Sequence, residues 1–99
     1  MKYYPDRWIV IKITSPEYGT VEKVLAGWYG GYLGSDSWKL NSGNKRTAEY
    51  EDRFEFTGHS GSVYVCYKSR YGVSNLTASM LEYFKQEVPI EVVNKYDVR

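Results

Sequence analysis

Apolar and polar positions alternate along much of the chain, which is typical of strands with one buried face. Residues 8–14, WIVIKIT, place their isoleucines on one face and predict a central strand. Residues 15–19 contain Pro and Gly and predict a turn. Residues 21–28, VEKVLAGW, fit either a strand or a helix. Their short length and the glycines that follow favour a strand, which forms a hairpin with the first.

Three further segments are also predicted to be strands. Residues 37–42, SWKLNS, alternate in polarity, so Trp38 and Lys39 face opposite ways. Residues 50–56 and 62–68 follow, separated by glycine-rich turns. In the first of these two segments the phenylalanines share one face, which we expect to be buried.

One amphipathic helix is predicted, over about residues 75–87. Ser74 or Asn75 can cap its first N–H groups, and Pro89 ends it. An apolar stripe at positions i, i+4, i+7 and i+8 is wide enough to cover a sheet. This stripe consists of Leu76, Met80, Tyr83 and Phe84. Residues 90–93 are predicted to add an edge strand.

This order of elements predicts an α+β fold, because a run of strands is followed by one helix and a last strand. We expect an antiparallel or mixed sheet of about five to six strands, with the helix packed on one face. The 99 residues show no linker or repeat, so residues 1–99 are interpreted as a single domain.

Composition excludes several classes of protein. The net charge of +1 argues against a dedicated nucleic-acid binder, which usually has a clear basic excess. One cysteine and one histidine cannot form an internal disulfide or a zinc site, and we expect no metal and no cofactor. The chain shows no signal-peptide pattern and no long apolar run, which predicts a cytoplasmic protein that does not contact a membrane.

Aromatic residues are unusually frequent, at 17% with eleven tyrosines. Tyrosine supplies rigid, amphipathic contact area, so binding surfaces are enriched in it. A small β-rich domain also uses aromatic side chains to cover a thin core. Both interpretations stay open for any one tyrosine.

Residues 27–43, GWYGGYLGSDSWKLNSG, combine glycines and hydroxyl side chains. They lack the Lys-Ser/Thr ending of a phosphate-binding loop and the glycine spacing of a dinucleotide fold. Gly30 and Gly31 either approach a ligand or make a turn. Ser35 and Asp36 either form the rim of a pocket or hydrogen-bond locally.

Two tryptophans flank this loop, and a second glycine-serine loop follows at residues 58–62. Trp28 and Trp38 either present both indoles to a flat ring or belong to the core. Backbone N–H groups and hydroxyls of the second loop can hold a phosphate. His59 lies beside serines there, but no third group is identified to orient it as a catalytic base.

The segments YLGSDSWKLNSG and GHSGSVYVCYKSRYGVSN, followed by a helix rich in small and aromatic residues, resemble a group of small accessory proteins of tailed bacteriophages and prophages. The resemblance covers roughly residues 8–84. It implies a small protein that acts inside a bacterium, where such proteins often inhibit host defence. They do so by binding a host protein or by sequestering a nucleotide signal.

The leading hypothesis is therefore a non-enzymatic binding protein that sequesters a nucleotide-derived small molecule. The alternatives are an inhibitor of a host protein that acts through a tyrosine-rich surface, and a small nucleotide hydrolase that uses His59 or Asp36. A two-fold homodimer stays open, through an edge strand or the helix. Arg53, Arg46 or Arg70 is expected to face phosphates. The predicted ligand-binding residues are Trp28, Tyr29, Gly30, Gly31, Ser35, Asp36, Trp38, Asn41, Ser42, Arg53, Ser60, Gly61 and Ser62.

Overall fold

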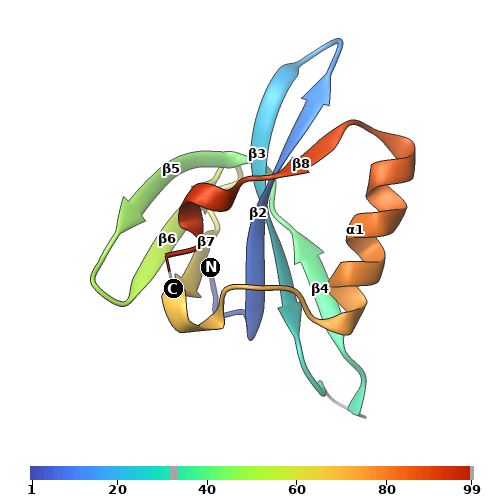
Figure 1. Ribbon diagram of the computed structural model, residues 1–99. Helices are drawn as coiled ribbons and strands as arrows, with labels where there is room; N and C mark the ends of the chain where they lie inside the picture. Colours follow the sequence, from blue (N-terminus) through green and yellow to red (C-terminus); the bar gives the residue numbers. More distant parts are fainter. Residues whose placement is uncertain (32–33, 99) are drawn as a thin grey trace.

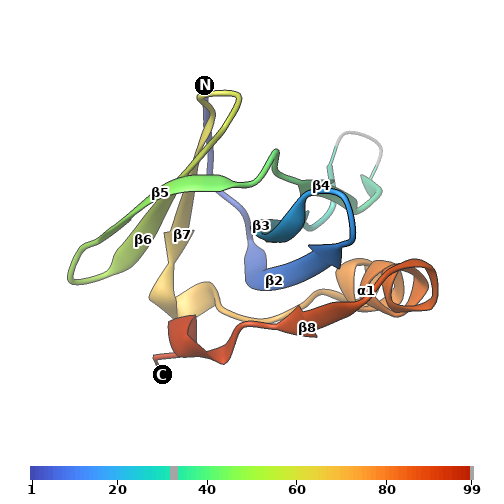
Figure 2. The same ribbon diagram turned by 90° about the horizontal axis from the view of Figure 1, so that it is seen from above.

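The computed structural model describes residues 1–31 and 34–98, which form two four-stranded sheets and one packed helix. Seen from above, the two sheets and the helix form three successive layers (Figure 2). One sheet is the middle layer. The other sheet packs against one of its faces, and the helix packs against the opposite face. The predicted α+β class and the position of the helix on a sheet face are confirmed.

The middle layer is an antiparallel sheet in the order β4-β3-β2-β8 (Figure 1). Its strands are β2 (Arg7–Ser15), β3 (Gly19–Trp28), β4 (Ser37–Leu40) and β8 (Ile90–Val92). The predicted hairpin is present, because β2 pairs with β3 along its whole length. β2 is an inner strand, as expected, and its first half is buried on both faces because the other sheet and the helix cover it.

The outer sheet has the order β1-β7-β6-β5, with β1 parallel to β7 and the other pairs antiparallel. Its strands are β1 (Lys2–Tyr3), β5 (Asn44–Glu49), β6 (Arg53–Gly58) and β7 (Val63–Tyr67). The polarity pattern missed β1 and β5. β1 has only two residues, and β5 reads NKRTAE, a polar edge strand without an apolar face. The described residues thus form eight strands, in two sheets instead of one.

Helix α1 (Asn75–Glu87) covers the face of the middle sheet opposite the outer sheet and contacts β3 and β4. Ser74 is the N-cap: its Oγ accepts from the Thr77 N–H at 3.1 Å, and Thr77 Oγ1 accepts from the Ser74 N–H at 2.8 Å. The buried positions are Thr77 and Leu81. The expected stripe was wrong at Tyr83, which is 54% exposed, because the sheet lies on the Thr77 side of the helix.

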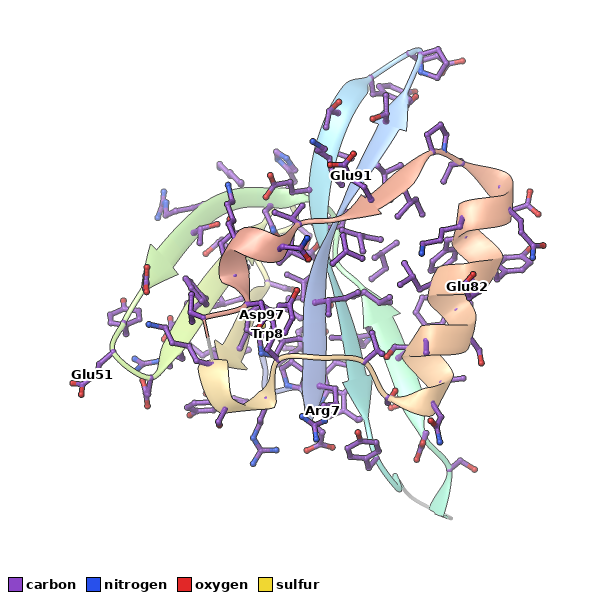
Figure 3. All side chains as sticks on the ribbon, viewed as in Figure 1. Arg7, Trp8, Glu51, Glu82, Glu91 and Asp97 are labelled. Atoms are coloured by element: carbon purple, nitrogen blue, oxygen red, sulfur yellow. The ribbon has the colours of Figure 1, made fainter. Side chains whose placement is uncertain are left out.

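Trp8 lies at the centre of the core between the two sheets (Figure 3). It is fully buried, and its ring centroid lies 5.7 Å from that of Phe56 and 5.0 Å from that of Tyr71. Its indole N–H donates to the carbonyl of Tyr67 at 2.8 Å. The predicted buried face of β6 is confirmed, since Phe54 and Phe56 both pack here. No helix in residues 1–31 and 34–98 is long and apolar enough to cross a membrane.

Gly27 allows the start of helix α1 to approach β3 closely. A Cβ atom at this position would lie 2.9 Å from Thr77 Cγ2 and 3.0 Å from Ser74 Oγ. We expect Gly27→Ala to lower the free energy of unfolding by about 1–3 kcal/mol in urea denaturation, because the capped helix start must shift. Alanine ordinarily stabilises a strand relative to glycine. A lower free energy of unfolding for Gly27→Ala would therefore indicate a clash of the new methyl group with the start of α1.

The matched control is Thr77→Ser, which keeps the capping hydroxyl and removes the nearest methyl group. The double variant Gly27→Ala/Thr77→Ser should recover part of the lost stability. An unchanged midpoint for Gly27→Ala would contradict this packing.

Candidate functional site

A groove opens between the two sheets, along their edge strands β1 and β4. It consists of two adjacent hollows of about 590 and 340 Å³ that share Tyr3. We call the whole the inter-sheet groove. Its aromatic end is lined by Lys2, Tyr3, Tyr4, Trp28, Ser37, Trp38 and Lys39. Its serine end is lined by Tyr3, Lys23, Leu40, Asn41, Ser42, Gly58, Ser60, Ser62 and Tyr64.

Register explains why the sheets separate at this edge. Across the middle sheet, Trp8 pairs with Ala26 and Ala26 with Lys39, so these three side chains share one row and one face. The facing row of the outer sheet runs from Phe56 through Tyr64 to Tyr3. Large apolar side chains fill the space between the sheets at the Trp8 end of this row, whereas the opposite end of the row is the exposed Lys39. The space between the edge strands is therefore left open.

Aromatic rings line the aromatic end. The centroid of Tyr3 lies 4.9 Å from that of Tyr64 and 6.3 Å from that of Trp28. The Trp28 indole N–H donates to the carbonyl of Tyr4 at 3.0 Å, which holds the N-terminal segment against β3. Lys39 Nζ lies 5.3 Å from the Tyr3 centroid, within range of a cation–π contact.

Two polar loops meet at the serine end. Ser42 Oγ accepts from the Ser60 N–H at 3.0 Å and donates to Ser60 Oγ at 3.3 Å. The His59 N–H donates to the carbonyl of Gly43 at 3.0 Å. This approach requires glycine at position 58, because a Cβ there would lie 2.8 Å from Ser42 Oγ. Residues 42–43, at the end of the 27–43 segment, therefore lie against the turn at residues 58–60.

The groove is positively charged. Lys2, Lys23 and Lys39 line it, and within the described residues none of them forms an ion pair. No Asp or Glu among those residues lines either hollow. The described lysines that do pair with carboxylates lie elsewhere: they are Lys12, Lys68, Lys85 and Lys95.

The hydroxyl of Tyr64 is held in its neutral form. Burial raises the pKa of Tyr64, and the neighbouring Tyr3 adds a smaller effect in the same direction. The phenol therefore stays protonated at neutral pH and adds no negative charge to the groove.

The two tryptophans are not presented together. Gly27 pairs with Trp38 and Trp28 with Ser37, so the two indoles lie on opposite faces of the sheet. Trp38 contacts helix α1, with its ring centroid 5.5 Å from that of Phe84. Trp28 alone points towards the outer sheet, and the predicted stacking pair is wrong.

The glycine loop after β3 closes on itself. The Gly31 N–H donates to the Ser35 carbonyl at 2.7 Å, and Asp36 Oδ1 accepts from the Gly30 N–H at 2.9 Å. Gly30 has a φ of +50°, as a turn requires. These contacts favour the turn interpretation, and the described residues of this loop, 30–31 and 34–36, do not line the groove. Tyr32 and Leu33 of the same stretch lie outside the described residues.

Tyr29 and two of the three predicted phosphate-facing arginines, Arg53 and Arg70, are engaged in other contacts. The Tyr29 hydroxyl accepts from Arg7 at 3.1 Å, and Asp6 accepts from the Tyr29 N–H at 2.8 Å and from Arg70 at 3.1 Å. Arg53 donates to Glu55 and Asp52, each at 2.8 Å. These two hydrogen bonds raise the pKa of Arg53, and the one to Glu55 has the larger effect. Arg53 is thus paired with two carboxylates and does not line the groove.

The two residues considered for catalysis, His59 and Asp36, do not line the groove. His59 lies in the exposed turn between β6 and β7, together with Gly61 of the predicted binding set. Cys66 is fully buried in β7, and burial raises the pKa of its thiol, as a structural cysteine requires. Among the described residues, no group of three His, Cys, Asp or Glu side chains is placed to hold a metal ion.

The groove gathers part of the predicted binding set. It includes Trp28, Trp38, Asn41, Ser42, Ser60 and Ser62. It omits Tyr29, Gly30, Gly31, Ser35, Asp36, Arg53 and Gly61. Sequence reasoning missed Lys2, Tyr3, Lys23, Lys39 and Tyr64. One sequence signal could have identified Lys39: the alternation of residues 37–42 already placed Lys39 and Asn41 on the face opposite Trp38.

Asn41 supports the wall of the groove through its amide. It is 4% exposed, and its Oδ1 accepts from the Val24 N–H at 2.9 Å and the Gly43 N–H at 3.3 Å. We expect Asn41→Ala to cost about 1–3 kcal/mol of unfolding free energy, because buried N–H groups lose their acceptor. Asn94→Ala, at an exposed position, is the control for thermal denaturation. Equal melting temperatures for the two variants would contradict this role.

These contacts define a cationic groove with an aromatic wall and a hydroxyl-lined end. Comparison of the chain with protein-family models, curated proteins and solved structures found no match.

Proposed function

We propose that this chain is a non-enzymatic binding protein that sequesters an anionic, nucleotide-derived small molecule in the inter-sheet groove. The observation that carries the proposal is the set of three lysines, Lys2, Lys23 and Lys39, around a groove without carboxylates in the described part of the chain. An anionic ligand would complement their charge.

The other lining groups match the remaining parts of a nucleotide. Trp28 and Tyr3 offer ring faces on which a base can stack, an interaction worth about 1–3 kcal/mol for each base. Ser37 and Ser62 offer hydroxyls for polar atoms of a sugar or a base edge. Concave sites of several hundred Å³ with a few polar groups are typical of small-molecule binding.

A tyrosine-rich docking surface has less support. Three of the exposed tyrosines lie on separate parts of the fold: Tyr18 in the β2–β3 turn, Tyr50 in the β5–β6 turn and Tyr83 on α1. Tyr4 and Tyr29, which are also exposed, lie on neighbouring segments beside the groove. A contiguous patch is what marks a protein interface. Hydrolysis also has less support, since neither His59 nor Asp36 lines the groove.

The resemblance to phage accessory proteins supplies a biological setting for the proposal. In that setting the ligand is a signal nucleotide of a bacterial host, and its sequestration blocks the response that the signal triggers. This role is part of the proposal.

Substitution of Lys39 tests the proposal directly. Wild-type protein is titrated by calorimetry with cyclic dinucleotides, cyclic trinucleotides, ADP-ribose and ADP. We expect Lys39→Gln to weaken the binding of the best ligand about tenfold, because a charge-assisted contact is lost. Lys45→Gln is the matched control, since Lys45 is an exposed lysine on β5 that does not line the groove.

Two results would contradict the proposal. One is the absence of measurable binding across the whole panel. The other is an equal loss of affinity in both variants, which indicates a general effect of net charge instead of a contact in the groove.

A further inference from the structure

We infer that the serine end of the groove binds a phosphoryl group, so that the ligand lies along the groove with its ring at the aromatic end. This inference rests on the proposed function and narrows it. It selects nucleotides over nucleosides and free bases, because the described lining of the serine end offers hydroxyl and ammonium donors that a phosphoryl group can use.

Hydrogen-bond donors are available at this end. Ser42 is fixed by Ser60, since its Oγ accepts from the Ser60 N–H and donates to Ser60 Oγ. The Ser60 hydroxyl thus accepts from Ser42 and keeps its own hydrogen for another acceptor. Within the described residues the Ser62 hydroxyl has no hydrogen-bond partner, although it lines the hollow. Two hydroxyl hydrogens can therefore reach phosphoryl oxygens.

Charge favours an anion at the same place. Lys23 lines the serine end, and Lys39 lies beside Tyr3, the residue that both hollows share. The neutral Tyr64 phenol adds a further hydroxyl without charge. The hollow of about 340 Å³ also has room for a phosphoryl group with bound water. Ammonium and hydroxyl donors without a nearby carboxylate form a suitable environment for a phosphate.

The two ends of the groove differ in chemistry. The aromatic end carries Tyr3, Tyr4, Trp28 and Trp38 with two lysines, and Ser37 is its only serine among the described lining residues. Among the described residues, the serine end carries three serines and one lysine, so hydroxyl donors are what distinguish it. Tyr3 lies between them, so a ring stacked there and a phosphoryl group beside it belong to one compact ligand of mononucleotide size.

Inorganic pyrophosphate tests the serine end without a base. Calorimetric titration of the full-length protein should detect its binding. We expect Ser62→Ala and Lys23→Gln each to weaken it about tenfold or more, because each removes a donor to the anion. Ser69→Ala, at an exposed position outside the groove, is the matched control. Thermal melts establish that each variant is folded.

Pyrophosphate should also compete with ADP for binding. Adenosine, which has no phosphoryl group, should bind with the same affinity to the wild type and to Ser62→Ala. If ADP binds but pyrophosphate neither binds nor competes, the inference is overturned and the proposed function stands. If pyrophosphate binds in a Ser62-dependent way while no nucleotide of the panel binds, the phosphoryl site stands and the proposed function fails. Equal affinities for pyrophosphate in Ser62→Ala and Ser69→Ala would also overturn the inference.

Discussion

The packing of Trp8 between the two sheets is the constraint on which the rest of the structure depends. Its indole is fully buried, contacts rings of the outer sheet and donates to the carbonyl of Tyr67. A side chain of this size holds the sheets apart on its own side, and burial of its rings stabilises that spacing. Along the same row Ala26 is small and Lys39 is charged, so this row supplies little apolar bulk between the sheets at the far edge, where Tyr3 and Trp28 are in ring contact. The groove is a direct consequence of that gradient in side-chain size and polarity.

Four separate segments contribute to the groove, and no one of them forms a site alone. The N-terminal strand brings Lys2 and Tyr3, and β3 brings Lys23 and Trp28. Strand β4 with the connection after it, and the turn between β6 and β7, bring the hydroxyls. The same arrangement separates the lysines of the groove from acidic partners, while Arg53, Lys68 and Arg70 are paired with nearby carboxylates. Lysines without a carboxylate among the described lining residues, next to aromatic rings and hydroxyls, characterise this surface.

Local patterns predicted much of the fold. The hairpin of β2 and β3, the buried face of β6 and the bounds of α1 all follow from periodicity, turn residues and the Ser74 cap. Strands β1 and β5 were missed because neither has an apolar face of its own. Four residues of the predicted binding set, Asn41, Ser42, Ser60 and Ser62, line the serine end of the groove. The expected stacking of Trp28 with Trp38 was wrong, because a one-residue difference in register places two side chains on opposite faces.

The sequence by itself determined six of the eight described strands, the helix and the residues that make the turns. These properties depend on neighbours within a few positions along the chain. Only the tertiary structure decided that the strands divide into two sheets, that Trp28 and Trp38 diverge and that Lys39 faces Tyr3. Those outcomes depend on pairing register and on the contact of one sheet with another, which join residues far apart in sequence. Residues 27–43 illustrate both the local and the tertiary contribution. The glycines of this segment make the turn that their chemistry predicts, and the groove forms beside that turn.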